Sequence, residues 1–167
     1  NVERIRPQTL EPFDFEQSNV SDGLWLAEGF TQYYGELLLL RAGLDRPEVW
    51  LATLAGFIHT KQQQPGGRLF SVINNSQQAV FTDAGSAIDK NNFINTHSSY
   101  YITGAATALA MELELRNRFG KTLDHFMQTL WQRHGKTGKP YTIAHLQDAL
   151  ATTTGDAQHA ARFFNAY

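Results

Sequence analysis

Apolar residues recur at helical spacing along most of this chain of 167 residues, and this periodicity limits its fold more than any other feature. The clearest stretch places apolar residues at i, i+3, i+4, i+7 and i+8, on one face of a helix: Leu123, Phe126, Met127, Leu130 and Trp131. Residues that favour helix ends bound such stretches, for example Thr142 at a predicted start and Gly43 at a predicted end. The pattern therefore predicts an all-α fold, a bundle of five or six helices.

The predicted helices alternate with irregular stretches. Residues 1–20, which Pro7 and Pro12 interrupt, are predicted to be an extended lead-in, and residues 65–97 are the least regular part. The first helix is predicted to start at a cap formed by Ser21 or Asp22. Helices are predicted at about 22–43, 47–64, 99–119, 122–131, 142–153 and 156–164, with a short one around 77–81. No internal repeat is visible, and residues 1–167 are predicted to form a single helical domain.

The long helix predicted at about 99–119 has an apolar face and a charged face. Its apolar face is predicted to consist of four residues at helical spacing: Ile102, Ala106, Leu109 and Leu113. Two pairs of opposite charge, spaced i, i+4, are predicted to lie on its solvent side: Glu112–Arg116 and Glu114–Arg118.

Composition excludes several classes of protein. The chain has 14 Lys and Arg against 16 Asp and Glu, so it lacks the basic excess typical of a nucleic-acid-binding protein. Its longest apolar run is the four leucines at 37–40, whereas a membrane helix needs about 18 apolar residues, so no membrane span is predicted. The absence of cysteine excludes disulfides, thiolate metal sites and a cysteine nucleophile, but it does not indicate a cellular compartment.

The six histidines form no metal-binding motif. None lies four residues from another, which rules out the H-x-x-x-H pair of a zinc-binding helix, and no glycine-rich phosphate loop is present. No cofactor-binding residue is therefore assigned by motif. Single histidines of this kind are mostly surface or lightly packed residues, and that is the prediction for each of them: His59, His97, His125, His134, His145 and His159.

One carboxylate lies within an apolar and aromatic helical segment. Glu28 follows Leu24-Trp25-Leu26-Ala27 and precedes Gly29-Phe30. A buried carboxylate is costly unless it has a partner, a proton or a metal ion. Gly29, next to it, allows another backbone or a ligand to approach closely. The alternative is that Glu28 lies on the exposed face of its helix, and the pattern alone does not separate the two.

A second candidate segment is Tyr100-Tyr101, which precedes the small residues Gly104 and Ala105 at a predicted helix start. Small residues allow either close helix packing or an open floor for a ligand. A phenol at such a floor donates a hydrogen bond to a developing oxyanion. The alternative is that both tyrosines are half-buried packing residues.

Together these segments resemble the glycyl aminopeptidase family of zinc metallopeptidases, which are gluzincins, thermolysin-like enzymes related to aminopeptidase N. The start of the chain, residues 1–7 followed by Pro12-Phe13-Asp14-Phe15, is similar to the family's N-V-K-R-I-R-P and P-F-D-Y stretches. Residues 24–34 are similar to its L-W-x-x-E-G-F-T-x-Y-Y stretch. Residues 100–105 are similar to its Y-Y-x-K-G-A stretch, and residues 138–142 fit a later loop.

The resemblance implies roles for three residues. The glutamate of the W-x-x-E-G stretch is the family's third zinc ligand, which corresponds to Glu28. The tyrosine of the Y-x-x-G-A stretch donates to the oxyanion of the transition state, and it corresponds to Tyr101, with Tyr100 as the second choice. Two positions depart from the family pattern, because Glu3 and Thr103 stand where the family usually has lysine. The resemblance therefore implies no substrate contact at these two positions of this chain.

The resemblance also implies how this chain relates to a larger enzyme. The family's H-E-x-x-H helix, with two zinc-binding histidines and the general-base glutamate, lies just upstream of the stretch with which this chain begins. The chain is therefore expected to be the helical part of a thermolysin-like catalytic domain, without its zinc helix. Its expected partners are a peptide substrate and the rest of the same polypeptide: the zinc helix, a β-rich domain and the PDZ domain that often follows.

The implied activity is zinc-dependent removal of N-terminal residues of the glycine or alanine type from peptides. Since a single carboxylate is a weak zinc site, this chain alone is expected to bind little zinc and to be inert. An alternative is that the chain is a non-catalytic helical module that binds peptides or acts as a scaffold. A third hypothesis is that apolar surface left without its partner makes the fragment self-associate.

Overall fold

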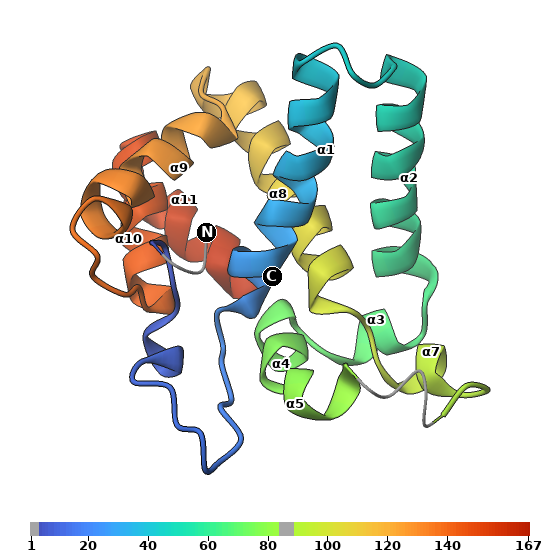
Figure 1. Ribbon diagram of the computed structural model, residues 1–167. Helices are drawn as coiled ribbons and strands as arrows, with labels where there is room; N and C mark the ends of the chain where they lie inside the picture. Colours follow the sequence, from blue (N-terminus) through green and yellow to red (C-terminus); the bar gives the residue numbers. More distant parts are fainter. Residues whose placement is uncertain (1–3, 84–88) are drawn as a thin grey trace. The chain divides into compact units, whose positions relative to one another are not determined.

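The computed structural model describes residues 4–83 and 89–167, and the regular structure of these residues is helical (Figure 1). Six helices of eight or more residues match the six longer helices predicted from periodicity. Within the described ranges, β structure amounts to a single isolated bridge between Pro7 and Tyr141. The prediction of an all-α fold is therefore confirmed.

The chain forms two compact units. One comprises the described residues up to Asn19 together with Ala110–Tyr167, and the other comprises Val20–Leu109. The longest helix, α8 (Tyr100–Phe119), contributes its first half to the second unit and the remainder to the first.

The unit of residues 20–109 opens with a π-helical segment, η2 (Trp25–Phe30), which continues directly into α1 (Thr31–Arg41). The predicted cap at Ser21 or Asp22 is wrong. The backbone N–H of Trp25 instead donates to Oγ of Ser76 at 2.9 Å, and Ser21 accepts from the N–H of Gly23. A side chain distant in sequence thus satisfies this helix start, which local pattern does not reveal.

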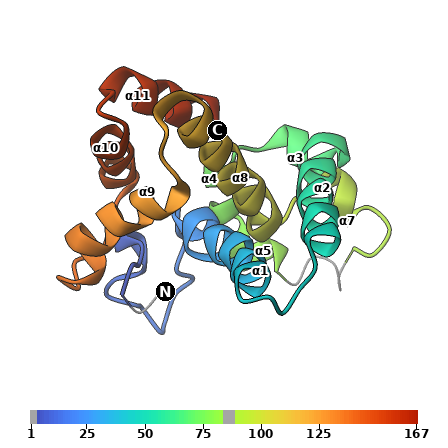
Figure 2. The ribbon, with the colours of Figure 1, turned by 90° about the horizontal axis from the view of Figure 1, so that it is seen from above.

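Helices α1 and α2 (Pro47–Gln63) lie side by side, as both ribbon views show (Figures 1 and 2). Gly43 has a φ of 70° after the end of α1, as predicted for a helix stop, and Pro47 occupies the first turn of α2. The rings of Tyr33 and Trp50 pack edge to face, with centroids 5.4 Å apart. This contact fixes the α1–α2 hairpin.

Short helices fill the stretch that the sequence marks as irregular: α3 (Gly66–Leu69), α4 (Val72–Gln77), α5 (Ala79–Thr82) and α7 (Phe93–Thr96). The short helix predicted around 77–81 corresponds to the junction of α4 and α5. The cluster Asp83-Ala84-Gly85-Ser86 predicts a turn in this stretch, but most of it lies outside the described residues. Gly66 lies so close to His97 that an added Cβ atom would be 2.1 Å from the His97 carbonyl oxygen.

The apolar face predicted for α8 is only partly correct. Leu109 is buried, whereas Leu113 is 56% exposed, and the buried stripe includes residues that are not strongly apolar. Burial of Thr103 and Thr107 costs little free energy, because their hydroxyls donate to the carbonyls of Ser99 and Thr103, one turn earlier. The buried positions of α8 are Tyr100, Thr103, Gly104, Ala105, Thr107, Ala108, Leu109, Met111, Glu112 and Leu115.

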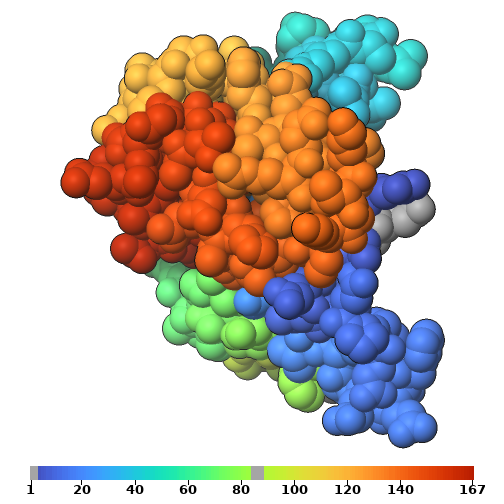
Figure 3. Space-filling model, turned by 90° about the vertical axis from the view of Figure 1, so that its left-hand side faces the viewer, coloured from blue at the N-terminus to red at the C-terminus, as the bar shows by residue number. Residues whose placement is uncertain are grey.

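The other unit packs the end of α8 with α9 (Leu123–Leu130), the π-helical segment η3 (Trp131–Gly135), α10 (Ile143–Thr154) and α11 (Ala157–Ala166). The predicted caps are confirmed, since side chains of Thr122, Thr142 and Asp156 hold the starts of α9, α10 and α11. Figure 3 shows the orange surface of α9 and η3 next to the surface of α10. The fully buried side chains of this unit include Leu115, Leu123, Phe126, Leu130, Tyr141, Leu146 and Leu150.

Glu112 was expected on the solvent side of α8, and this expectation is wrong. The residue is 4% exposed, and its carboxylate accepts both the guanidinium of Arg116, at 2.6 Å, and the backbone N–H of Leu123. A carboxylate at the positively polarised start of α9 satisfies an otherwise unpaired N–H group. The i, i+4 pair with Arg116 was predicted correctly, but burial of Glu112 was not.

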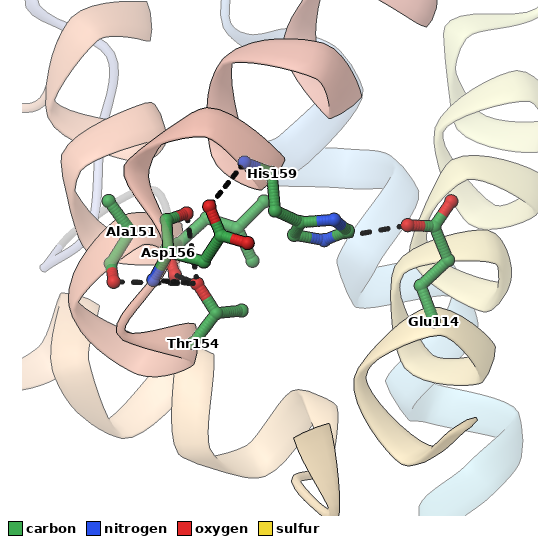
Figure 4. A network of polar contacts seen from close by, with 6 residues as sticks. Glu114, Ala151, Thr154, Asp156 and His159 are labelled. Carbon is green, nitrogen blue, oxygen red and sulfur yellow. Dashed lines mark hydrogen bonds and ion pairs between the residues drawn. The ribbon is translucent and has the colours of Figure 1, made fainter. Parts of the chain in front are cut away.

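Two histidines are buried rather than lightly packed. His134 and His159 are 6% and 2% exposed. Figure 4 shows the ring of His159 reaching from α11 toward Glu114 of α8, with Nε2 at 3.4 Å from the carboxylate. The backbone N–H of His159 donates to Asp156, the cap of α11. Burial lowers the pKa of both histidines, which favours their neutral forms.

The lead-in is mostly irregular, as predicted, and the Pro7–Tyr141 bridge joins it to the segment before α10. After a short turn of helix, η1 (Gln8–Leu10), the chain runs on without regular structure to residue 23. Backbone N–H groups of Gln8 and Tyr141 donate across the bridge at 2.8 and 2.9 Å.

In the described part of the chain, no helix has the length and apolar character needed to cross a membrane.

Candidate active site

Glu28 lies within the π-helical segment η2, between the buried residues Ala27 and Gly29, and is itself half-buried. π-helical turns are rare and occur often at functional sites, where the widened turn changes the direction of a side chain. The prediction left two alternatives, burial or the exposed face. The structure places Glu28 between them, with its carboxylate at the edge of an open cavity.

The backbone of η2 meets that of α8 directly beside Glu28. An added Cβ atom at Gly29 would lie 2.5 Å from the Cα atom of Gly104, and one at Gly104 would lie 2.2 Å from the carbonyl oxygen of Trp25. No residue with a side chain fits at either position without movement of the backbone. The prediction that Gly29 allows a close backbone approach is confirmed, and the approach sets the distance between Glu28 and the start of α8.

Tyr101 lies in the first turn of α8 and is 38% exposed. It lines the same cavity as Glu28, an open hollow of about 420 Å³. The remaining residues around the hollow come from α1: Thr31, Gln32, Gly35, Glu36 and Leu39. The structure thus brings together Glu28 and Tyr101, which the sequence had singled out in segments about 70 residues apart.

Tyr100 has a different environment from Tyr101. It is 5% exposed, and its hydroxyl donates to the carboxylate of Asp83 at 3.1 Å. The two tyrosine rings lie 4.8 Å apart, so the buried ring supports the exposed one. Of the two tyrosines that the sequence left as candidates, Tyr101 is therefore the one at the cavity.

Burial and the negative charge of Glu28 raise the pKa of the Tyr101 phenol above its ordinary value, burial being the larger cause. The pKa of Tyr100 is raised as well, by burial and then by Asp83. A phenol is protonated at neutral pH even at its ordinary pKa of about 10, and the upward shift adds to this preference. Tyr101, which lines the cavity, therefore carries an O–H group able to donate a hydrogen bond.

Sequence reasoning missed Glu36, a second carboxylate at the cavity. Its Oε1 atom accepts a hydrogen bond from the side-chain amide of Gln32 at 3.3 Å. Both residues line the cavity with Glu28, four and eight positions after it. That i, i+4, i+8 spacing marks one helix face and was the signal available in the sequence.

The described residues around the cavity do not form a complete metal site. Within residues 4–83 and 89–167, no three His, Asp or Glu side chains lie close enough together to hold a metal ion. Of the positions that depart from the family's lysines, Thr103 is fully buried and donates to the carbonyl of Ser99, and it is not among the residues that line this cavity. Glu3 lies outside the described residues.

The fold is similar to part of one solved structure. The crystal structure of an aminopeptidase N family protein from Idiomarina loihiensis matches 83% of this chain, with a TM-score of 0.71 and 28% sequence identity. The match spans 24% of the length of that protein. This chain therefore shares its helical fold with a part of that protein.

A model of one protein family matches more than half of this chain. The family model of M61 glycyl aminopeptidases matches residues 1–107, which include both Glu28 and Tyr101. The chain belongs to the M61 glycyl aminopeptidase family, as the motifs in its sequence had indicated. A comparison with curated proteins gave no match.

Proposed function

We propose that this chain is part of a zinc-dependent aminopeptidase, to which Glu28 contributes the third zinc ligand and Tyr101 the donor to the oxyanion. The observation that carries the proposal is the shared cavity of these two residues, in the positions that the family motifs imply. The substrates are peptides with N-terminal residues of the glycine or alanine type. This part of the proposal rests on membership of the family.

The side chains around the cavity suit a cation. Two carboxylates, Glu28 and Glu36, line it, and no Lys, Arg or His is among its described lining residues. A carboxylate oxygen is an accepted zinc ligand, and Glu28 is held half-buried at the cavity edge. The chemistry that zinc supplies in such sites is polarisation of the scissile carbonyl and a lower pKa for water. Because one carboxylate is a weak site, the 167-residue chain alone is expected to bind little zinc and to be inert.

Tyr101 supplies a hydrogen-bond donor at a fixed place. Its raised pKa keeps the hydroxyl protonated at neutral pH, so the O–H group donates to an oxyanion and keeps its own proton. The Gly29–Gly104 approach and the buried Tyr100 ring hold this side chain in position before substrate binds. Such preorganisation is what gives an oxyanion donor its effect, because the donor does not have to reorient during the reaction.

The proposal is tested by kinetics of the longest natural polypeptide that contains this sequence, with alanine and glycine anilides as substrates. Tyr101→Phe is expected to lower kcat by about 10²–10³, as the loss of other oxyanion donors does, with zinc content unchanged. Tyr100→Phe is the matched control and is expected to retain kcat within about threefold, since its hydroxyl is already bonded to Asp83. Equal kcat values for Tyr101→Phe and the unmodified protein would refute the role of Tyr101.

A further inference from the structure

A second cavity lies in the unit that contains α9 and α10. Its lining residues are far from Glu28 in the sequence and differ in chemical type from those around Glu28. It is an open hollow of about 390 Å³, a volume within the range of about 300–1,000 Å³ typical of small-molecule sites. Every side chain around it carries a hydrogen-bonding group: Lys121, His125, Gln128, Thr129, Gln132, Thr152 and Thr153. No carboxylate is among them.

Three lining residues of this cavity, Lys121, His125 and Gln128, offer hydrogen-bond donors. Among the described residues, the ammonium group of Lys121 has no hydrogen-bond or ion-pair partner. Nδ1 of His125 accepts the backbone N–H of Thr122 at 3.1 Å, so the neutral ring carries its proton on Nε2. The carboxamide of Gln128, one turn further along α9, adds two N–H groups.

The three threonines of the lining offer acceptors. The hydroxyls of Thr129, Thr152 and Thr153 donate to backbone carbonyls one turn earlier, at 3.0, 2.9 and 2.8 Å. The hydroxyl oxygens of Thr129 and Thr153 also lie 3.3 Å apart. A hydroxyl that donates to a carbonyl offers a ligand its oxygen lone pairs. Thr152 also accepts from Arg133 at 2.7 Å, which holds a guanidinium at the rim.

The surrounding sequence is strongly basic, although the whole chain is not. Residues 116–139 contain six Lys and Arg and one acidic residue, Asp124, which does not line the cavity. Of these cations, Lys121 lines the cavity and Arg133 bonds to Thr152 of its lining, whereas Arg116 is paired with Glu112. The two cations at the cavity favour a negatively charged ligand group.

We propose that the cavity between α9 and α10 binds a small anion that also carries hydroxyl groups, the class that includes sugar phosphates and sugar acids. The anionic group lies against Lys121, His125 and Gln128, and the hydroxyls of the ligand donate to the threonine oxygens. This assignment is independent of the peptidase site, because none of its residues lines the Glu28 cavity.

The proposal is tested by titration of the isotope-labelled 167-residue chain with glucose 6-phosphate, gluconate, glucose and inorganic phosphate. Glucose 6-phosphate and gluconate are expected to give saturable shifts of the side-chain amide signals of Gln128 and Gln132, and each of the other two probes to bind at least about tenfold more weakly. Saturation by phosphate alone at the same concentration would overturn the need for hydroxyl groups.

Two matched lysine variants make the test specific to the cavity. Lys121→Gln is expected to weaken glucose 6-phosphate binding by about tenfold or more, since it removes a charge-assisted hydrogen bond. Lys136→Gln changes an exposed lysine that does not line the cavity and is expected to leave the Kd within about twofold. Equal weakening by both variants, or no saturable shift with either hydroxylated anion, would overturn the proposal.

Discussion

Gly29 and Gly104 meet backbone to backbone, and a Cβ atom added to Gly29 would lie 2.5 Å from the Cα atom of Gly104. This approach lies next to Glu28 on one helix and three residues after Tyr101 on the other. Because the clash would be with backbone atoms, which cannot rotate away, the two helices would have to separate. The pair therefore acts as a spacer for the candidate active site.

Gly104→Ala is expected to lower the free energy of unfolding by about 1–3 kcal/mol or more, the usual effect of overpacking a tight contact. Urea unfolding followed by circular dichroism measures this change. Gly56→Ala is the control, since an added Cβ there meets nothing within 4 Å and alanine favours the helix by about 0.5–1 kcal/mol. A Gly104→Ala chain as stable as the Gly56→Ala chain would show that the contact does not exist.

The two neighbouring tyrosines are expected to differ in what they stabilise. Tyr100→Phe leaves the Asp83 carboxylate without its hydrogen bond and is expected to cost about 1–3 kcal/mol of unfolding free energy. Tyr101→Phe, at a side chain that is 38% exposed, is expected to change stability by less than about 0.5 kcal/mol. Denaturant midpoints of the two variants measure the difference, and a reversed order would contradict the assignment of Tyr101 to the cavity.

Protonation of His159 is expected to weaken the unit formed by α8–α11. Burial is the largest influence on its pKa, which it lowers; Glu114 and Asp156 raise the pKa, whereas Arg118 and Arg162 lower it. Because the folded-state pKa is below the unfolded value of about 6.5, the unfolded chain binds more protons near that pH. Stability is therefore fully present above about pH 6.5 and falls as the pH drops through the lowered folded-state pKa.

Urea midpoints between pH 7.5 and 5 measure this dependence, and His134, whose pKa burial also lowers, contributes in the same direction. His159→Gln is expected to reduce the loss of stability on acidification, because one of the two titrating groups is gone. An unchanged slope in this variant would mean that His159 keeps its ordinary pKa in the folded chain.

Local signals predicted the ends of the helices and most of the helices themselves. Thr122, Thr142 and Asp156 bond to backbone groups three residues away, so their roles follow from nearby sequence alone. The capping of Trp25 by Ser76 and the burial of Glu112 against Leu123 involve residues 51 and 11 positions apart. Contacts of that kind depend on how the helices pack, and helical periodicity does not encode them.

For the candidate site, the sequence predicted Glu28 and Tyr101 but not every feature of their surroundings. Glu28 stood out because a carboxylate among apolar residues is costly, and Tyr101 stood out beside small residues. The choice between Tyr101 and Tyr100 required the direction of each side chain, which adjacent positions in a sequence do not give. The π-helical form of η2 has no pattern of its own and was not predicted. Glu36 was missed, although its spacing from Glu28 was visible.

The 167-residue chain on its own is expected to be catalytically inert, because its described residues include no group of three side chains able to hold a metal ion. Alanine and glycine anilides, with and without added zinc, provide the assay. Hydrolysis that copurifies with the chain and disappears in Glu28→Gln would contradict this expectation, since it would show a complete site within these residues.

The measurement that tests the central claim most directly is the zinc content of the longest natural polypeptide that contains this sequence. About one zinc per chain is expected, as for a catalytic site with three protein ligands. Glu28→Gln is expected to lose the zinc, whereas Glu36→Gln, the other carboxylate of the same cavity, is expected to retain it. Equal zinc in Glu28→Gln and the unmodified protein, or none in either, would contradict the account, and the non-catalytic peptide-binding module would take its place.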